Sequence, residues 1–217
     1  HGYTVVIWPS GNSYEGNYVN GYRTGQGIKV WAHGSRYEGE WLNNKQHGHG
    51  VATWADGEYT GEFENDLFHG QGTMIYTDGS IYEGQWKHGG IQGNGQLIYL
   101  DGRSYTGEFK DNERNGHGLE VWSNGDQYEG AFINGVPNGL GIKQLHNKQR
   151  IEGNFKDGIA SGNGIISWPD GSIYEGEIQY NEPNGKGIIR LLNGTIYSGE
   201  WKNGRKDGLF IVTLSNG

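Results

Sequence analysis

Aromatic residues and glycines recur along this chain in a fixed alternating pattern. In one representative segment, Tyr37 is followed two residues later by Gly39 and four residues later by Trp41. The pattern starts again every 23 residues, with one step of 22. A period of this length predicts a repeat protein, in which each unit buries its apolar side chains against its neighbours. The leading positions are Tyr14, Tyr37, Tyr59, Tyr82, Tyr105, Tyr128, Ile151, Tyr174 and Tyr197.

The alternation predicts that each unit begins with a β-strand. Side chains two residues apart point to the same face of a strand, so Tyr37, Gly39 and Trp41 share one face. Glu38 and Glu40 point to the other face, and acidic residues recur at these positions in other units. Each first strand therefore has an aromatic face and an acidic face, and we expect the acidic face to keep the protein soluble.

Two turn signals divide each unit. The first follows the first strand, as in Asn20-Gly21 and Asn203-Gly204, where glycine supplies the positive φ that reverses the chain. We expect a second strand to start at the Gly-x-Gly sequence that comes next and to end before a second turn signal. Each unit is then a β-hairpin. The apolar positions that close the second strands are Trp31, Trp54, Tyr76, Tyr99, Trp122, Leu145, Trp168, Leu191 and Leu214.

The second turn also predicts the strand register. In Pro169-Asp170-Gly171, proline suits the first central position of a type I turn and glycine the left-handed residue after it. A three-residue loop of this kind pairs Trp168 with Ser172 and Ile166 with Tyr174. Both glycines of Gly162-Asn163-Gly164 then lie on the aromatic face, where we expect them to leave room for neighbouring rings.

These patterns predict an all-β fold, an elongated and twisted single-layer antiparallel meander of stacked β-hairpins with about eighteen strands. We expect one continuous array over residues 1–217, with a partial unit at 1–11 and repeats starting near 14, 37, 59, 82, 105, 128, 151, 174 and 197. His1-Gly2 matches the middle of a unit, which indicates a fragment of a longer chain. A local bend or changed twist is expected where His146-Asn147-Lys148 lacks the turn glycine and where Ile151 and Ile178 replace aromatic residues.

Composition excludes several other classes. Only 33% of the chain is hydrophobic and 42 residues are glycine, but 8 Trp, 14 Tyr and 6 Phe supply large rings. Disorder is disfavoured, because disordered segments are poor in aromatic residues and here the rings hold a fixed phase. The chain has no cysteine, so disulfides and cysteine-zinc sites are excluded. No long apolar run or signal-peptide pattern is present in this sequence, and we expect a cytoplasmic protein.

The first repeat, from Tyr14 through Gly16, Tyr18, Gly21 and Gly25 to Gly27, resembles the MORN repeat, written Y-x-G-x-W-x-x-G-x-x-H-G-x-G. The second repeat follows the same motif. The resemblance implies stacked hairpins with an aromatic and glycine-lined groove that receives a partner segment. MORN repeats also occur in lipid-kinase fusions, methyltransferases, membrane tethers, ciliary radial-spoke proteins and the cytoskeletal proteins of protozoan parasites. We therefore expect association with cytoskeleton, cilium or membrane cortex. The second repeat matches through Tyr37, Gly39, Trp41, His47, Gly48 and Gly50.

The aromatic face is the candidate partner-binding groove. A single-layer sheet cannot cover both of its faces, and a continuous apolar strip of this size exceeds what a soluble monomer normally exposes. An extended or helical peptide is the expected occupant, although the same rings also hold the sheet together. The predicted groove residues are Tyr14, Tyr18, Trp31, Tyr37, Trp41, Trp54, Tyr59, Phe63, Tyr76, Tyr82, Trp86, Tyr99, Tyr105, Phe109, Trp122, Tyr128, Phe132, Trp168, Tyr174, Tyr197 and Trp201.

Charge argues against two other kinds of partner. The net charge is -8, and residues 46–86 contain seven carboxylates but no Lys or Arg. Nucleic-acid binding is disfavoured, because phosphate attraction dominates its affinity. Polybasic attraction to acidic lipid is worth about 1 kcal/mol per cation, and nearby carboxylates offset most of it. Weak lipid contact through Lys202, Arg205 and Lys206 is the form of membrane binding that remains open.

Three patterns suggest chemistry but have simpler explanations. His47 and His49 face the same way on a strand, but equivalent residues in successive units lie roughly 10 Å apart, too far for one zinc ion. Glu38 and Glu40 have no cleft or base to organise them for acid–base catalysis. Each Gly-x-Gly opens a strand rather than a helix, so it does not form a phosphate loop. We expect no catalytic residues, cofactor or metal.

The sequence therefore predicts a non-catalytic scaffold that binds a protein partner. A phospholipid-binding tether and a regulatory module of an enzyme outside this segment remain as alternatives. Self-association through the last strand is a further expectation, because an open apolar edge invites pairing. The predicted end residues are Phe210, Ile211, Val212 and Leu214.

Overall fold

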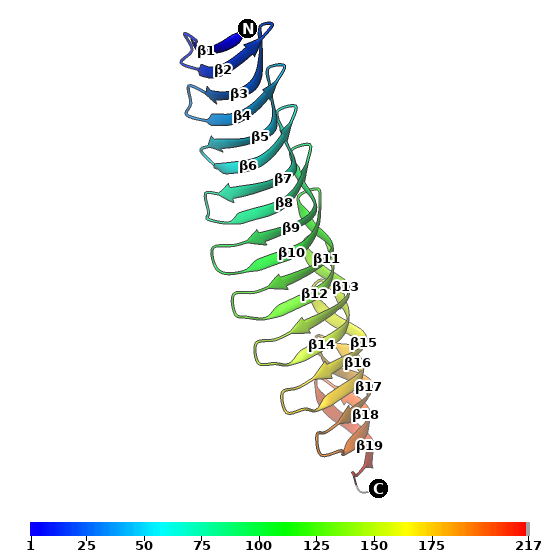
Figure 1. Ribbon diagram of the computed structural model, residues 1–217. Helices are drawn as coiled ribbons and strands as arrows, with labels where there is room; N and C mark the ends of the chain where they lie inside the picture. Colours follow the sequence, from blue (N-terminus) through cyan, green and yellow to red (C-terminus); the bar gives the residue numbers. More distant parts are fainter. Residues whose placement is uncertain (216–217) are drawn as a thin grey trace. The chain divides into compact units, whose positions relative to one another are not determined.

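The computed structural model describes residues 1–215 and contains nineteen β-strands, with no helix in that part of the chain (Figure 1). The strands belong to one antiparallel sheet. The predicted all-β hairpin meander is therefore confirmed. The chain divides into two compact units, His1–Glu113 and Arg114–Gly217, and the boundary falls inside a strand of the fifth repeat rather than in a linker.

Within each unit, every strand pairs with the strands next to it in sequence. The strands before the boundary are β1 (Gly2–Ile7), β2 (Ser13–Val19), β3 (Tyr22–Val30), β4 (Arg36–Leu42), β5 (Lys45–Trp54), β6 (Gly57–Glu64), β7 (Leu67–Tyr76), β8 (Ile81–Lys87), β9 (Gly90–Ile98) and β10 (Ser104–Lys110). The others are β11 (Glu113–Val121), β12 (Gln127–Ile133), β13 (Val136–Gln144), β14 (Arg150–Lys156), β15 (Ile159–Ser167), β16 (Ile173–Gln179), β17 (Glu182–Arg190), β18 (Ile196–Lys202) and β19 (Arg205–Thr213).

The first reversal of each repeat is a two-residue turn in which both residues have positive φ. Asn20 and Gly21, for example, have φ of 52° and 82°. These are the backbone angles of a type I′ turn, which matches the twist of the flanking strands and favours Asn, Asp and Gly. The fourth and eighth repeats depart from that preference, because His88 (φ 51°) and Tyr180 (φ 54°) occupy the first turn position.

The second strand starts directly after this turn, and not at Gly-x-Gly as predicted. Gly16 pairs with Gly27 and Tyr18 pairs with Arg23, so one residue of β2 lies opposite three residues of β3. The first glycine of Gly-x-Gly is the bulged residue, with φ of 85° at Gly25. A bulge bends its strand and increases the local twist. The interrupted ladder therefore bends the second strand at Gly-x-Gly, where the sequence predicted that this strand would begin.

This bulge corrects the predicted role of Gly162. Its φ is 81°, and a Cβ atom there would meet nothing within 4 Å, so it does not make room for a ring. The second glycine of the motif does so in most repeats. A Cβ on Gly50, for example, would lie 2.6 Å from the phenol oxygen of Tyr37. The two glycines of Gly-x-Gly therefore have different physical roles.

The second reversal has the predicted register. The Trp168 amide donates to the Ser172 carbonyl at 3.0 Å, and Ile166 pairs with Tyr174. At the turn without glycine, Lys148 adopts the left-handed conformation with φ of 74°, and the closing bond from Leu145 to Gln149 is kept at 2.8 Å. The second reversal also explains the single 22-residue step. In the second repeat Trp54 pairs directly with Gly57, so the loop between the strands is one residue shorter than in the other repeats.

The core is a row of aromatic rings. The tyrosines that lead the repeats are 0% or 1% exposed, apart from Tyr197 in the last repeat, which is half-buried. In the first unit, rings meet edge to face in an unbroken series with centroid distances between 4.9 and 5.4 Å. Such contacts add about 0.5–1.5 kcal/mol each beyond the buried area. The series runs through Tyr14, Trp41, Tyr37, Phe63, Tyr59, Trp86, Tyr82, Phe109 and Tyr105.

Polar atoms of these rings bond to the main chain. The Tyr59 hydroxyl donates to the carbonyl of Glu62 at 2.9 Å, and the buried tyrosines of the other repeats donate to the equivalent carbonyl. The indole of Trp41 donates to the carbonyl of Gly27 in the preceding repeat at 3.0 Å. Buried phenol and indole groups need such partners, which explains why tyrosine, and not phenylalanine, leads the repeats.

The ring series of the second unit is interrupted in the seventh repeat. Ile151, the leading residue of this repeat, has no ring. A Cβ atom added to Gly164 would lie 2.7 Å from Cδ1 of Ile178, so Ile178 occupies the space that a tyrosine fills in other repeats. Strand pairing is unchanged, since Gly153 still pairs with Gly164. In the last repeat, the ring of Phe210 lies over Gly199 in place of the usual tyrosine.

Candidate partner-binding surface

The structure separates the predicted groove residues into two groups. The rings that lead the repeats, and most of the aromatic residues four positions later, are buried. Rings buried to this extent form the core and offer little surface to a partner in this conformation. The buried members are Tyr14, Tyr37, Trp41, Tyr59, Phe63, Tyr82, Trp86, Tyr105, Phe109, Tyr128, Phe132, Tyr174 and Trp201.

The remaining predicted groove residues are half-buried, and most of them lie at the second reversal. Basic side chains cover several of these rings. Lys29 Nζ lies 3.8 Å from the Trp8 ring centroid and 6.0 Å from that of Trp31, and Arg103 lies 4.4 Å from the ring centre of Tyr99. Burial lowers the pKa of Lys29. The half-buried members are Tyr18, Trp31, Trp54, Tyr76, Tyr99, Trp122, Trp168 and Tyr197.

The hollow surface of the second unit lies on the opposite face of the sheet. A cavity of about 1050 Å³ is lined there by Ile165, Ile188, Leu209 and Ile211 among polar residues of β15 to β19. Leu209 is 97% exposed and Ile211 is 74% exposed. Strand pairing matches Ile188 with Glu175 and with Ser198, residues that point away from the buried rings. None of the predicted groove residues lines this cavity.

A smaller hollow on the same face extends the surface. It has a volume of about 440 Å³ and is lined by residues that include Leu140, Ile142 and Glu152. Ile142, Ile165, Ile188 and Ile211 recur at the 23-residue period. We name this row, with Leu119 before it, the isoleucine row. The same periodicity that located the tyrosines contains this signal, but the sequence reasoning assigned that face to solvation by glutamate.

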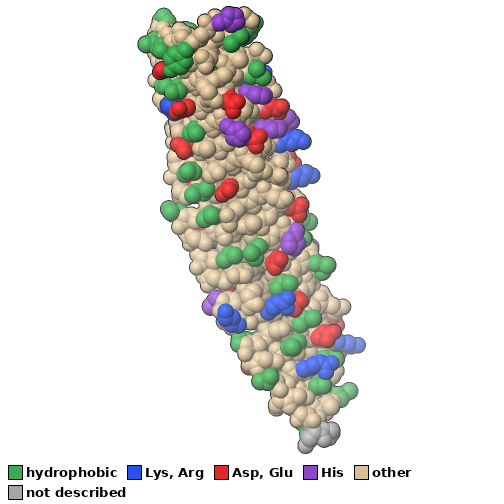
Figure 2. All heavy atoms as spheres, viewed as in Figure 1, with side chains coloured by type: hydrophobic (Ala, Val, Ile, Leu, Met, Phe, Trp, Pro, Cys, Tyr) green, Lys and Arg blue, Asp and Glu red, His purple; other side chains and the backbone are tan. Residues whose placement is uncertain are grey.

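Charged residues of both signs surround the isoleucine row. Glu175, Glu200, Lys186 and Arg190 line the larger cavity together with the apolar residues. The space-filling view likewise shows hydrophobic and charged side chains interspersed along the visible face rather than collected into one patch (Figure 2). The lining of the cavity therefore mixes apolar residues with charges of both signs.

The glutamates three positions after the leading tyrosine are structural. Glu40 Oε1 accepts a bond from the His49 amide at 2.9 Å, and Glu62 Oε1 accepts one from Gln71 at 2.8 Å. Gln85 does the same for Asn94 at 2.9 Å, which shows that the acceptor and not the charge is required. These side chains satisfy the amides that the bulge leaves unpaired. Solubility is therefore only part of the role predicted for Glu40.

The predicted lipid-contact residues come together at the end of the chain. Lys202, Arg205 and Lys206 line a hollow of about 430 Å³ that Asp207 also lines. Lys206 Nζ lies 2.9 Å from the centroid of the Tyr197 ring, and burial lowers the pKa of Lys206. Of the predicted self-association residues, Phe210 is half-buried, whereas Ile211, Val212 and Leu214 are exposed.

The fold and its surfaces define an antiparallel β-hairpin repeat protein. The chain belongs to the MORN-repeat family. The family model matches residues 14–36, 37–58, 59–81, 82–102, 105–127, 128–150, 152–173, 174–196 and 197–209. A search of the curated proteins gives no match. Among residues 1–215 there is no helix with the length and hydropathy needed to cross a lipid bilayer.

Solved structures of a second protein share the fold. The TCP10 domain of Danio rerio CPAP, in complex with a peptide of Danio rerio STIL, matches with a TM-score of 0.52 and 12% identity, over 99% of this chain and 100% of that chain. A point mutant of the same Danio rerio domain matches with a TM-score of 0.53 and 13% identity, over 98% of this chain and 99% of that chain. At this identity the likeness concerns the fold alone.

Proposed function

We propose that this protein is a non-catalytic scaffold whose second unit binds an extended segment of a protein partner along the isoleucine row. The observation that carries the proposal is the open cavity of about 1050 Å³ lined by Ile165, Ile188, Leu209 and Ile211. Leu209 and Ile211 are exposed and Ile188 is half-buried, and apolar surface in an open hollow favours a partner. The CPAP domain of the same fold, solved in complex with a peptide, is a precedent for peptide binding by this fold.

The repeat spacing suggests the form of the partner. Equivalent residues in successive repeats are two strands apart, which is about 9.5 Å. Three residues of a polyproline II segment span about 9.3 Å. An extended segment with an apolar side chain at every third position therefore matches the isoleucine row when it runs across the strands. The charged margin accommodates polar residues between these positions.

The arrangement of carboxylates supports the non-catalytic part of the proposal. Glu40, Glu62 and Glu177 accept main-chain amide bonds in their own repeats. They are therefore separated along the chain by its period and serve the backbone. General acid–base catalysis requires a side chain positioned within hydrogen-bond reach of the transferred proton, whereas these carboxylates are engaged by backbone amides.

A peptide-display selection against the whole chain tests the proposal. We expect selected peptides to contain apolar residues three positions apart and to lose at least about tenfold in affinity for Ile188→Asp, since a charge replaces an anchor in a desolvated pocket. Trp122→Ala is the matched control on the other face, and it should leave affinity within about twofold. Loss of binding with Trp122→Ala and retention with Ile188→Asp would instead support the aromatic groove.

The C-terminal end supports a second, independent interaction. Val212 and Leu214 are exposed on or next to β19, the last strand within residues 1–215, and an edge strand can pair with another chain. We expect reversible self-association, measured as an increase in mass with concentration by light scattering. Val212→Lys should reduce it, because charge on an edge strand opposes pairing. A constant monomer mass at high concentration would contradict this expectation.

A further inference from the structure

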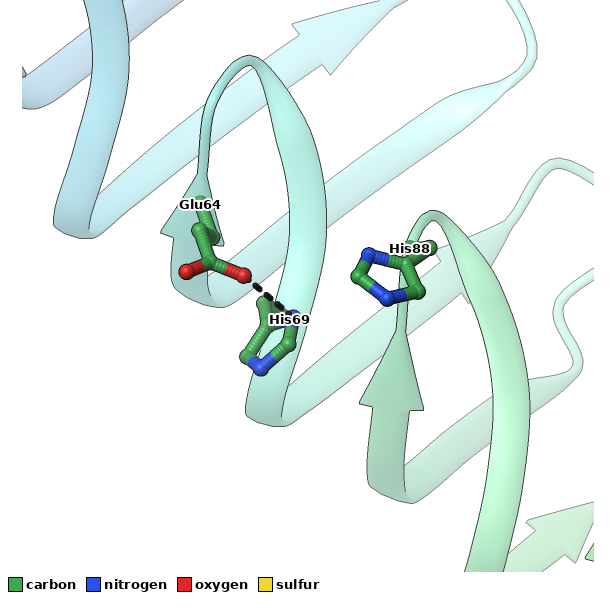
Figure 3. Close-up of side chains that lie close together, drawn as sticks. All are labelled: Glu64, His69 and His88. Atoms are coloured by element: carbon green, nitrogen blue, oxygen red, sulfur yellow. Dashed lines mark ion pairs between the residues drawn. The ribbon is translucent and has the colours of Figure 1, made fainter.

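Three potential metal ligands meet where the third and fourth repeats adjoin. Glu64 ends β6, His69 lies in β7 and His88 is the first turn residue after β8. One ligand atom from each lies within 4.8 Å of the other two. Figure 3 shows the His69 ring between the Glu64 carboxylate and the His88 ring, with all three side chains bordering a common space.

The backbone holds these three residues together. The type I′ turn at Asn65-Asp66 folds β7 back on β6, and Glu64 pairs with Leu67 while Glu62 pairs with His69. The turn of the next repeat is tied to the same strand, because the Gly89 amide donates to the Phe68 carbonyl at 2.9 Å. His88 is therefore fixed beside His69 by a main-chain bond between their neighbours. Only side-chain rotations are needed to adjust the three ligands.

The imidazole of His69 lacks a hydrogen-bond partner for one nitrogen. Its Nδ1 atom is buried and makes no hydrogen bond, although Glu64 Oε2 lies 3.3 Å away. That separation is within ion-pair distance. A buried unsatisfied nitrogen is uncommon in folded proteins and needs an explanation. Two ligands of a tetrahedral zinc ion are about 3.3 Å apart, the separation that this pair already has.

Other repeats show that the site is particular to this place. The positions of His69 and His88 correspond to Gln92 and Asp111 one repeat later, where Gln92 Nε2 donates to Asp111 Oδ1 at 2.8 Å. These positions therefore touch across repeats even without histidine. Within residues 1–215, Glu64, His69 and His88 form the one group of three His, Cys, Asp or Glu residues spaced to hold a metal ion.

Spacing between equivalent residues argued against a metal site, but this group is made of non-equivalent positions. The surrounding charge also favours a cation. Residues 46–86 carry seven carboxylates and no Lys or Arg, although Lys87 lines the shallow hollow beside His69. Two imidazoles and one carboxylate suit zinc and related transition metals, whereas magnesium and calcium prefer oxygen ligands.

We propose that Glu64, His69 and His88 bind one divalent transition-metal ion of the zinc class per chain. Three protein ligands leave the fourth position of a tetrahedral ion open to water or to a donor from another molecule. The ion joins the two histidines and thereby links the third repeat to the fourth. Its loss removes this link but not the aromatic core.

Zinc titration of the metal-stripped chain against a chromophoric chelator tests the proposal. We expect one zinc equivalent per chain and no competition by magnesium. His88→Asn should weaken binding at least about tenfold, because even the loss of an outer-shell partner costs about 10–100-fold. Asn occupies this turn position in several other repeats and tolerates its positive φ, so this variant is expected to fold.

His47→Gln is the matched control, since His47 occupies in the second repeat the position that His69 has in the third. It should bind zinc as the unchanged chain does. Zinc should raise the Tm of the unchanged chain and of His47→Gln but not of His88→Asn. Equal Tm values of the three proteins without zinc would confirm folding. Absent or non-stoichiometric zinc binding, or equal affinity in both variants, would overturn the proposal.

Discussion

The phenol oxygen of Tyr128 donates a hydrogen bond to the main-chain carbonyl of Ala131, 3.1 Å away. The ring is buried, so water cannot replace this bond without opening the core. The same bond recurs at the buried leading tyrosines of other repeats. It joins the aromatic row to the backbone at the position where the first strand approaches its turn.

Tyr128→Phe should therefore destabilise the fold although the ring is kept. We expect a loss of about 1 kcal/mol, the usual net value of one hydrogen bond, measured by urea denaturation. Tyr128→Ala should cost about 3–5 kcal/mol because it also leaves a cavity. Tyr180→Phe is the control at an exposed turn position, where the change should stay within about 0.5 kcal/mol. Equal effects of Tyr128→Phe and Tyr180→Phe would contradict the structural role of the bond.

Stability should fall in alkaline solution. Burial raises the pKa of Tyr128 to about 12, and burial with the nearby Glu177 charge raises the pKa of Tyr174 to about 12. The unfolded chain loses these protons near pH 10 and the folded chain only near pH 12. The unfolded state then binds fewer protons, and folding is progressively disfavoured between these values. Denaturant midpoints from pH 8 to 11.5 should decline less steeply in Tyr128→Phe than in the unchanged chain.

Two glycines at equivalent positions should respond differently to substitution by alanine. A Cβ on Gly130 would lie 2.6 Å from the Leu140 carbonyl oxygen and 2.7 Å from the Tyr128 hydroxyl, whereas a Cβ on Gly153 would meet its nearest atom at 3.4 Å. Gly130→Ala should cost about 1–3 kcal/mol through overpacking. Gly153→Ala should be neutral or stabilise by up to about 1 kcal/mol, since it restricts the unfolded chain. Thermal unfolding of the pair distinguishes local crowding by backbone and ring from a general need for glycine.

Glutamates such as Glu62 accept hydrogen bonds from backbone amides at the bulge, and substitutions there test whether the acceptor or the negative charge is required. Glu62→Ala removes the acceptor of the Gln71 amide and should cost about 1 kcal/mol. Glu62→Gln keeps an acceptor, as Gln85 does in the next repeat, and should cost less than about 0.5 kcal/mol. Glu83→Ala, at an exposed position, provides the control for loss of one negative charge. In urea denaturation, only the variant that lacks a hydrogen-bond acceptor at position 62 should lose stability clearly.

The effect on stability of restoring a tyrosine at position 151 should depend on Ile178 of the next repeat. Ile178 occupies the space over Gly164, so Ile151→Tyr alone should cost about 1–3 kcal/mol by overpacking. Ile178→Ala vacates that space, and the double variant should be more stable than the sum of the single effects by at least about 0.5 kcal/mol. Additive effects in this double-mutant cycle would show that the two side chains do not compete for one space.

The sequence predicted the local structure because local rules govern it. Asn-Gly and Asp-Gly pairs have the φ preferences of tight turns, and alternation of Tyr, Gly and Trp defines strands whatever lies around them. The pairing of Ile166 with Tyr174 follows from a three-residue loop. Lys148 is an exception to these preferences, and hydrogen bonds across the turn hold it in the left-handed conformation that glycine adopts elsewhere.

The candidate sites could not be predicted from the sequence in the same way. Alternation shows that a strand has two faces but does not show which face is covered. The rings pack against neighbouring repeats, so most of the leading tyrosines are buried, and the hollow lies beside Ile188 on the other face. The side chains of Glu64, His69 and His88 meet because a turn of one repeat bonds to a strand of another.

The sequence by itself determined the repeat, its hairpins, its turns and most of its register, since each depends on residues close together in the chain. Tertiary structure decided which aromatic residues are accessible, which face is hollow and which potential metal ligands converge. Those properties depend on contacts between repeats. A periodic sequence describes every repeat alike, whereas a site arises where non-equivalent positions of neighbouring repeats come together.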